Sequence, residues 1–256
     1  MTDVKKLFDL TNQIALITGG ASGLGYYYTQ ALVEAGADVC IVSRSTDGWE
    51  TTRAYVESHG HRVEFMQQDI TVVGAAAKII DHCINVFGRL DILVNNAGIQ
   101  IRNNLLDFAD ADWLKVIDTN LNALYFLAHE AARVMIPQHS GKIINIGSMQ
   151  SFRAGKFIYP YAASKHGVIG LTKAYADGLA PEGIQVNVLA PGYINTEMTK
   201  PLQADVSRNA EILAHIPAGH WADPSELKGT IVFLASAASN YISGATIPVD
   251  GGYLLR

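Results

Sequence analysis

Short runs of apolar, often β-branched residues alternate along the chain with longer stretches of helical periodicity. Most of these runs are apolar at nearly every position, which is typical of strands that are buried on both faces. The expected strands are Ile14–Thr18, Asp38–Val42, Arg62–Gln67, Asp91–Val94, Lys142–Gly147, Ile184–Ala190 and Thr246–Val249. Helical periodicity fills the segments between them, for example in Leu24–Ala35, Trp113–Met135 and Ala162–Leu179. Strand–helix alternation predicts an α/β fold with a parallel sheet and right-handed crossovers.

Composition narrows the class of protein. Of the 256 residues, 49% are hydrophobic and 17% are charged, so a large core can be buried. No linker or low-complexity segment is visible, so we expect a single domain that spans residues 1–256. The net charge of -5, without a basic run, argues against nucleic-acid binding. No run approaches the ~18 apolar residues of a membrane span, and no signal-peptide pattern follows the first residues. We therefore expect a soluble, cytoplasmic protein.

Histidine and cysteine give no sign of a metal site. The eight histidines are scattered, and none stands in a His-Glu-x-x-His pattern. Cys40 falls in an expected strand and Cys83 in an expected helix. They are interpreted as small buried residues in a reducing compartment, and no metal is predicted.

A glycine-rich turn joins the first expected strand to the first expected helix. Its sequence is Thr18-Gly19-Gly20-Ala21-Ser22-Gly23-Leu24-Gly25. Such a turn presents free backbone N–H groups and the positive end of a helix dipole to an anion. Glycine also lets a pyrophosphate approach the backbone closely. A tight turn without a ligand is the alternative, but the place of this turn in the first strand–helix unit favours a dinucleotide.

The end of the second strand bears on the choice of nucleotide. An acidic residue there would bind the ribose 2′-hydroxyl, but this chain has Ser43-Arg44. Arg44 can pair with a 2′-phosphate, which favours NADP(H) over NAD(H). Two alternatives stay open: Arg44 as a solvated loop cation, and Asp47 as the ribose ligand.

Four polar residues form a candidate catalytic group. Tyr161 and Lys165 lie four positions apart in an expected helix and therefore share a face. A free tyrosine has a pKa of about 10, and a neighbouring ammonium is expected to lower it. Ser148 follows the fifth expected strand, where its hydroxyl can donate to a substrate carbonyl. Asn120 lies in the middle of an expected helix, where asparagine is disfavoured. This indicates either a function or a structural role, as a capped kink or a core hydrogen bond.

Taken together, these motifs resemble the short-chain dehydrogenases/reductases over almost the whole chain. The segments that carry the resemblance are Thr18-Gly-x-x-x-Gly23-x-Gly25, Asn95-Asn96-Ala97-Gly98, Asn120, Ser148, Tyr161-x-x-x-Lys165 and Pro191-Gly192. The resemblance implies a Rossmann-type, doubly wound, seven-stranded parallel sheet in three αβα layers. It also implies a tetrad in which Ser148 and Tyr161 polarise a carbonyl, Lys165 also bonds the nicotinamide ribose, and Asn120 holds a proton-relay water. A homotetramer is implied too, and the apolar tail Tyr253-Leu254-Leu255 is consistent with it.

The same resemblance assigns the remaining cofactor contacts. Besides the glycine turn, Ser43, Arg44, Tyr161 and Lys165, these are Asp69, Ile70, Asn96, Ala97, Gly98, Pro191, Gly192, Ile194 and Thr196. Asp69 matches the adenine contact, and Ile194 and Thr196 match the contacts to the nicotinamide carboxamide.

Within the family, the chain is most similar to the 2-deoxy-gluconate 3-dehydrogenase and gluconate 5-dehydrogenase group, which interconverts keto and hydroxy sugar acids. The matching segments are Lys142–Met149, Ala190–Tyr193, Ile216–Gly219, Phe233–Ser236 and Val249–Arg256. Where that group often has two adjacent arginines, this chain has Ile101 and Arg102. Where it often has an arginine before Trp221, this chain has His220.

The substrate region is expected at residues 193–221, which form a polar lid. A polar lid fits a small polar substrate better than an acyl chain or a steroid. Arg102 and Arg153 are candidates to hold a carboxylate, Gln150 to bond a hydroxyl, and Tyr193 to line the site. The alternatives are a reductase of another small ketone, of the 3-oxoacyl or polyol type, and a nucleotide sensor without catalysis. The complete set of Asn120, Ser148, Tyr161 and Lys165 argues against a sensor.

Overall fold

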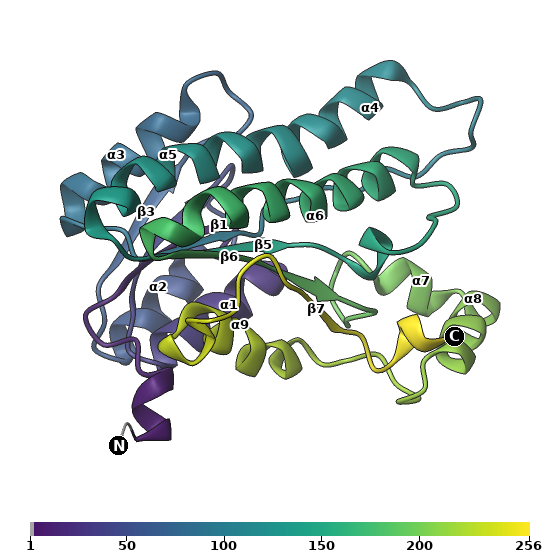
Figure 1. The fold of residues 1–256 in the computed structure, drawn as a ribbon. Coiled ribbons are helices and arrows are strands. Elements are labelled where there is room, and N and C mark those ends of the chain that lie inside the picture. The colour runs from purple at the N-terminus through teal and green to yellow at the C-terminus, as the bar shows by residue number, and fades with distance from the viewer. Residues whose placement is uncertain (1–2) are drawn as a thin grey trace.

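A computed structural model describes residues 3–256 (Figure 1). The strands form one seven-stranded sheet in the order β3-β2-β1-β4-β5-β6-β7, and every pair of neighbours is parallel. They are β1 (Ile14–Thr18), β2 (Asp38–Ser43), β3 (Val63–Gln67), β4 (Ile92–Asn95), β5 (Gly141–Ile146), β6 (Ile184–Pro191) and β7 (Thr246–Val249). The predicted parallel sheet is confirmed, and β1 and β7 have the predicted bounds.

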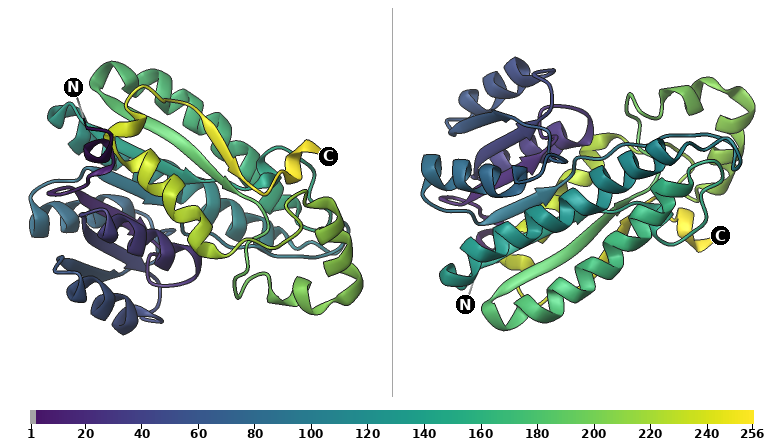
Figure 2. Two further views of the ribbon diagram at one scale, coloured as in Figure 1. Left: turned by 90° about the horizontal axis from the view of Figure 1, so that it is seen from below. Right: turned by 90° about the horizontal axis from the view of Figure 1, so that it is seen from above.

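Helices cover both faces of the sheet. They are α1 (Gly23–Glu34), α2 (Trp49–Ser58), α3 (Ala75–Phe87), α4 (Asp110–Ile117), α5 (Ala123–Gln138), α6 (Tyr159–Leu179), α7 (Lys200–Ala204), α8 (Val206–His215) and α9 (Lys228–Ala235). Helices α1, α2 and α9 pack on one face, and α3, α5 and α6 pack on the other (Figures 1 and 2). The three αβα layers are therefore as predicted.

The central strands are apolar throughout because they have no exposed face. Every residue of β1, β4 and β5 is buried. Along β1, Ile17 packs in the layer of α1 and α9, whereas Leu16 packs in the layer of α3 and α5. A helix needs an apolar stripe on one side only, as in α3, where Ile79, Ile80 and Cys83 are buried at helical spacing.

The expected helix Trp113–Met135 is longer and interrupted. Helix α4 begins at Asp110, and a π-helical turn over Asp118–Asn122 separates it from α5, which ends at Gln138. The interruption follows from Asn120, whose side chain bonds a distant backbone segment and thereby widens the turn.

The segment between β6 and α9 lies beyond the carboxyl ends of the strands (Figure 1). Its helices α7 and α8 fall within the polar lid expected at residues 193–221, for which no helix bounds were predicted. Ile212 and Ile216 of this segment pack against Tyr253 in the short C-terminal 3-10 helix η7 (Tyr253–Leu255). Within residues 3–256, no helix combines the length and the apolar character that a bilayer crossing requires.

Candidate active site

One cleft of about 550 Å³ runs along the carboxyl edge of the sheet. It brings together most of the predicted site residues, although they come from segments far apart in the sequence. The predicted residues that line it are Gly19, Ser22, Gly23, Leu24, Ser43, Arg44, Asp69, Ile70, Asn96, Ala97, Gly98, Arg102, Ser148, Gln150, Tyr161, Lys165, Pro191, Gly192, Tyr193, Ile194 and Thr196. Gly25, Asn120 and Arg153 are not part of its lining.

The glycine turn at one end of this cleft needs its glycines for steric reasons. Gly19 has a φ of +66°, in the left-handed region that favours glycine. A Cβ on Gly25 would lie 2.0 Å from the carbonyl oxygen of Gly19, so no side chain fits there. Ser22 precedes α1, and its side chain makes no capping hydrogen bond. The N–H groups of the first helical turn are thus not capped by Ser22, as an anion-binding turn requires.

The end of β4 braces the glycine turn. The hydroxyl of Thr18 accepts hydrogen bonds from the backbone N–H groups of Asn96 and Ala97, each at 3.0 Å. In return, the Asn96 side-chain amide donates to the carbonyl oxygens of Thr18, at 2.9 Å, and Gly19, at 3.3 Å. The turn therefore has a fixed shape that depends on Asn96, a residue more than 70 positions away.

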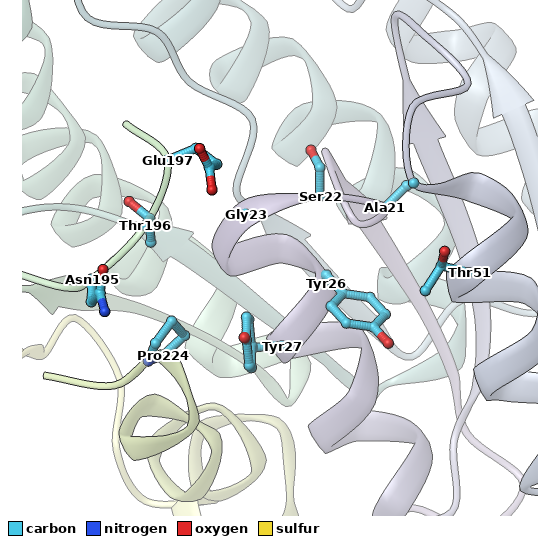
Figure 3. A pocket seen from close by; sticks show the side chains of 11 residues that line it. Ala21, Ser22, Gly23, Tyr26, Tyr27, Thr51, Asn195, Thr196, Glu197 and Pro224 are labelled. Carbon is cyan, nitrogen blue, oxygen red and sulfur yellow. The ribbon is translucent and has the colours of Figure 1, made fainter. Parts of the chain in front are cut away.

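A second hollow, of about 300 Å³, lies on the other flank of the first turn of α1 (Figure 3). Ser22, Gly23, Thr196 and Glu197 line both hollows. In Figure 3, Tyr26 lies between Thr51 of α2 on one side and Tyr27 on the other. The start of α1 is therefore open on two sides.

The end of the cleft near β2 and β3 carries acidic side chains with fixed hydrogen bonds and the exposed cation Arg44. The Asp69 carboxylate accepts hydrogen bonds from the Thr71 N–H at 2.9 Å and from the Thr71 hydroxyl at 2.7 Å. These bonds, the backbone one above all, lower the pKa of Asp69 against a raising effect of burial, and Arg44 adds to the lowering. The exposed Arg44 side chain makes no ion pair within residues 3–256. Asp47 also lines the cleft, and it accepts a hydrogen bond from the Ser45 hydroxyl at 2.8 Å.

Ser148 and Tyr161 meet in the middle of the cleft. Ser148 begins a short 3-10 helix, and its hydroxyl accepts a hydrogen bond from the N–H of Gln150 at 3.1 Å. Helix α6 begins at Tyr159 with Pro160 in its first turn, and this places Tyr161 at the cleft. Burial raises the pKa of Tyr161, and a hydrogen bond with the Ser148 side chain partly offsets that rise.

The Lys165 side chain lies near the Tyr161 ring, but its ammonium donates a hydrogen bond to the backbone of the sheet. It is 5% exposed, and its Nζ donates to the carbonyl oxygen of Ile146 at 2.6 Å. The same Nζ lies 5.7 Å from the centre of the Tyr161 ring. Burial lowers the pKa of Lys165 to about 8. The expected net lowering of the Tyr161 pKa is wrong for this geometry, because burial outweighs the effect of the ammonium, which donates to the Ile146 carbonyl and not to the phenol.

Asn120 sits behind the catalytic residues, 1% exposed. Its side-chain oxygen accepts from the N–H of Ile99 at 2.8 Å, and its amide donates to the carbonyl of Ile99 at 2.9 Å. The amide also donates to the Ser164 hydroxyl at 3.2 Å. Asn120 therefore ties the π-helical turn to the segment after β4 and to α6, so the structural alternative for this residue has direct support.

The predicted substrate residues fall into two groups. Arg102, Gln150 and Tyr193 line the cleft. The side-chain oxygen of Gln150 is buried and has no hydrogen-bond partner within residues 3–256. Arg153 lies outside the lining, with its guanidinium carbon 4.7 Å from the centre of the Tyr253 ring.

One residue that organises the site was not predicted. The Thr199 hydroxyl donates to the carbonyl of Ile194 at 2.7 Å and accepts from the N–H of Thr196 at 3.0 Å. It thereby fixes the loop that carries two expected cofactor contacts. A threonine bonding the backbone of nearby residues is a known turn signal, so Thr196-Glu-Met-Thr199 is a pattern that could have revealed it.

Known proteins resemble this chain over nearly its full length. A family model described as "Enoyl-(Acyl carrier protein) reductase" matches residues 19–254. The chain is 49% identical over 249 residues to the uncharacterized oxidoreductase YgcW of Escherichia coli (strain K12), covering 97% of this chain and 95% of that protein. It is 43% identical to 2-dehydro-3-deoxy-D-gluconate 5-dehydrogenase of Bacillus subtilis (strain 168), covering 97% of each. Gluconate 5-dehydrogenase from Burkholderia cenocepacia J2315, solved with NADP and tartrate, superposes with a TM-score of 0.95 at 38% identity, covering 99% of this chain and 100% of that one.

Proposed function

The chain belongs to the short-chain dehydrogenase/reductase family, and from this premise we propose that it interconverts a hydroxyl and a keto group on a sugar acid such as a gluconate or deoxygluconate. It is a nicotinamide-dependent oxidoreductase that acts on CH–OH groups. The observation that carries the proposed substrate is the position of Arg102, which lines the same cleft as Ser148 and Tyr161. A carboxylate is the natural partner of its guanidinium.

The residues of the cleft divide the work along its length. The N–H groups at the start of α1 would hold the pyrophosphate, Asp69 the adenine, Asn96, Ala97 and Gly98 the adenosine and its ribose, and Ile194 and Thr196 the carboxamide. Pro191 and Gly192 also line the cleft. When bound, the nicotinamide supplies or accepts the hydride.

Proton transfer falls to the pair in the middle of the cleft. In the reductive direction, the Ser148 hydroxyl donates a hydrogen bond to the substrate oxygen, and Tyr161 donates its proton to that oxygen. The raised pKa of Tyr161 keeps the proton on the phenol before reaction. The Lys165 ammonium, 5.7 Å from the centre of the Tyr161 ring, stabilises the phenolate that forms.

We propose NADP(H) as the preferred cofactor. The exposed Arg44 at the end of β2, which makes no ion pair with the described residues, suits a 2′-phosphate, and the Burkholderia cenocepacia gluconate 5-dehydrogenase was solved with NADP. Asp47 in the same lining would favour NAD(H) if it bound the ribose hydroxyls.

We also propose a cytoplasmic homotetramer. Large apolar side chains are exposed on α4 and α5, where a neighbouring copy would cover them: Trp113, Leu114, Tyr125 and Phe126. Light scattering coupled to gel filtration measures this directly. A monomeric mass at micromolar concentration would contradict it.

A substrate panel tests the proposed function. Purified protein is assayed with NADP(H) and with NAD(H) against keto sugar acids, neutral keto sugars, polyols and a 3-oxoacyl thioester. We expect the highest kcat/KM for a keto sugar acid with NADPH. A preference for the thioester or for a neutral polyol would reject the sugar acid, and equal use of NADH would reject the role of Arg44.

A further inference from the structure

A cluster of aromatic rings lies between the lid and the C-terminal turn, at the substrate end of the cleft. Its centre is Tyr253, which is 7% exposed. The Tyr253 ring packs edge-on against Tyr193 with centroids 5.1 Å apart, and it contacts His215 at 4.4 Å. Tyr193 also packs against Trp221 at 4.9 Å. Of these rings, only that of Tyr193 belongs to the lining of the cleft.

Arg153 stands over this cluster. Its guanidinium carbon lies 4.7 Å from the centre of the Tyr253 ring, within the range of a cation–π interaction. Arg153 is half-buried and forms no ion pair or side-chain hydrogen bond with any residue from 3 to 256. The charge of a partly desolvated cation without an anionic partner acts strongly on neighbouring polar groups, because the local dielectric constant is low.

The positive charge of Arg153 lowers the pKa of the Tyr193 phenol, against a larger raising effect of burial. Burial raises the pKa of Tyr193 to about 12, and the Tyr253 phenol adds to the rise, whereas Arg208 and Arg153 lower it. Arg208 lies on α8 and is paired with Glu211 at 2.6 Å, so part of its charge is neutralised. Arg153 has no such partner within the described residues, and so it is the cation with an unneutralised charge near the Tyr193 hydroxyl.

We propose that Arg153 and Tyr253 are positioning residues for acidic substrates. Tyr253 holds the Arg153 guanidinium behind Tyr193, and the Tyr193 hydroxyl donates a hydrogen bond into the cleft, to the carboxylate of the substrate. Arg153 thus strengthens acid binding without touching the substrate, and Arg102 remains the contacting cation. This inference rests on the proposed preference for sugar acids.

Equilibrium binding to the NADPH complex tests this inference without turnover, because the reduced cofactor cannot accept a hydride from a hydroxy acid. The dissociation constants of D-gluconate and of the neutral polyol D-sorbitol are measured by calorimetry. Arg153→Met and Tyr253→Leu are expected to weaken gluconate binding about tenfold and sorbitol binding less than about twofold. Tyr253→Phe keeps the ring and removes a phenol that raises the pKa of Tyr193, so it should bind gluconate at least as tightly as the wild type. Arg153→Lys should recover part of the loss.

Arg133→Met is the matched control, because Arg133 is an exposed arginine on α5 outside the lining of the cleft. It should change neither constant. Equal weakening of gluconate and sorbitol, or a loss in Tyr253→Phe as large as in Tyr253→Leu, would overturn the positioning role and leave a structural one. A wild type that binds gluconate, with the expected losses in the variants, but does not oxidise it would reject the proposed reaction alone. A wild type that binds no sugar acid would overturn both.

Discussion

The two ends of the cleft differ in whether backbone atoms or side chains form them. The proposed nucleotide end is formed largely by the backbone of the glycine turn, whose shape follows from local turn chemistry and from the bonds between Thr18 and Asn96. At the substrate end, side chains from the lid, the β5–α6 segment and the C-terminus meet in one aromatic cluster around Tyr253. The first end suits a ligand of constant shape, whereas the second can change its substrate through single side chains.

The sharpest test of this division is at the point where the two ends meet. Tyr161→Phe removes the proton donor and, of the expected cofactor contacts, only the Tyr161 hydroxyl. We expect kcat to fall about 10³-fold, within the range for loss of a general acid. The Kd of NADPH, measured by fluorescence titration, should stay within about twofold of the wild type.

Tyr159→Phe is the control, since Tyr159 lies two residues away and outside the lining of the cleft. It should leave kcat unchanged. If Tyr161→Phe keeps more than a tenth of the wild-type kcat, another group donates the proton.

A methyl group at the nucleotide end should be nearly as damaging. The Cβ of Gly25→Ala would lie 2.0 Å from the Gly19 carbonyl oxygen and must displace the turn. We expect NADPH binding to weaken about 100-fold, together with a lower Tm.

Gly170→Ala in α6 meets nothing within 4 Å and should leave NADPH binding unchanged, with stability equal or up to about 1 kcal/mol higher. Unaltered binding in Gly25→Ala would show that the turn shifts at little cost.

At the substrate end, Arg102→Met should discriminate between substrates. The loss of a charge-assisted bond to a carboxylate is expected to raise KM for a keto sugar acid about 30-fold. KM for a neutral ketone should change less than about threefold. Similar changes for both substrates would remove Arg102 from carboxylate binding.

The pH profile tests the lysine that serves both ends. The pKa of Lys165 is lowered from 10.5 to about 8 by burial, so the side chain is charged below pH 8 and becomes neutral above it. Because the neutral amine no longer stabilises a phenolate, kcat/KM for reduction should fall about tenfold per pH unit above pH 8. In Lys165→Arg the guanidinium does not titrate, and the decline should disappear. A wild-type profile that is flat to pH 10 would contradict the assignment.

Most of the sheet could be predicted because its strands are buried on both faces. A continuous apolar run such as Ile14–Thr18 has few other interpretations in a chain with helical periodicity on either side. The position of the break between α4 and α5 could not be predicted, because it depends on hydrogen bonds between Asn120 and Ile99 that exist only in the folded chain. The bounds of α7 and α8 could not be predicted for a related reason: both helices are short, and Ile212 of α8 packs against η7 only in the folded chain.

The candidate site was predicted better in its members than in its electrostatics. Spacing brings Tyr161 and Lys165 to one helix face, and the structure places both in the cleft lining. The sign of the Tyr161 pKa shift depends on the water excluded by surrounding side chains, and the sequence does not give that burial. Arg153 is a similar case, because the C-terminal ring that it covers is a hundred residues away.

The bonds between β4 and the glycine turn have a consequence for the speed and strength of association. Since Thr18 and Asn96 already fix the turn within the folded chain, little conformational freedom remains to be lost when a dinucleotide arrives. The conformational entropy of the turn is therefore lost when the chain folds and not when the dinucleotide binds. The receptor for the phosphates is thus rigid in advance, and encounter rather than rearrangement should limit the rate of capture at that end.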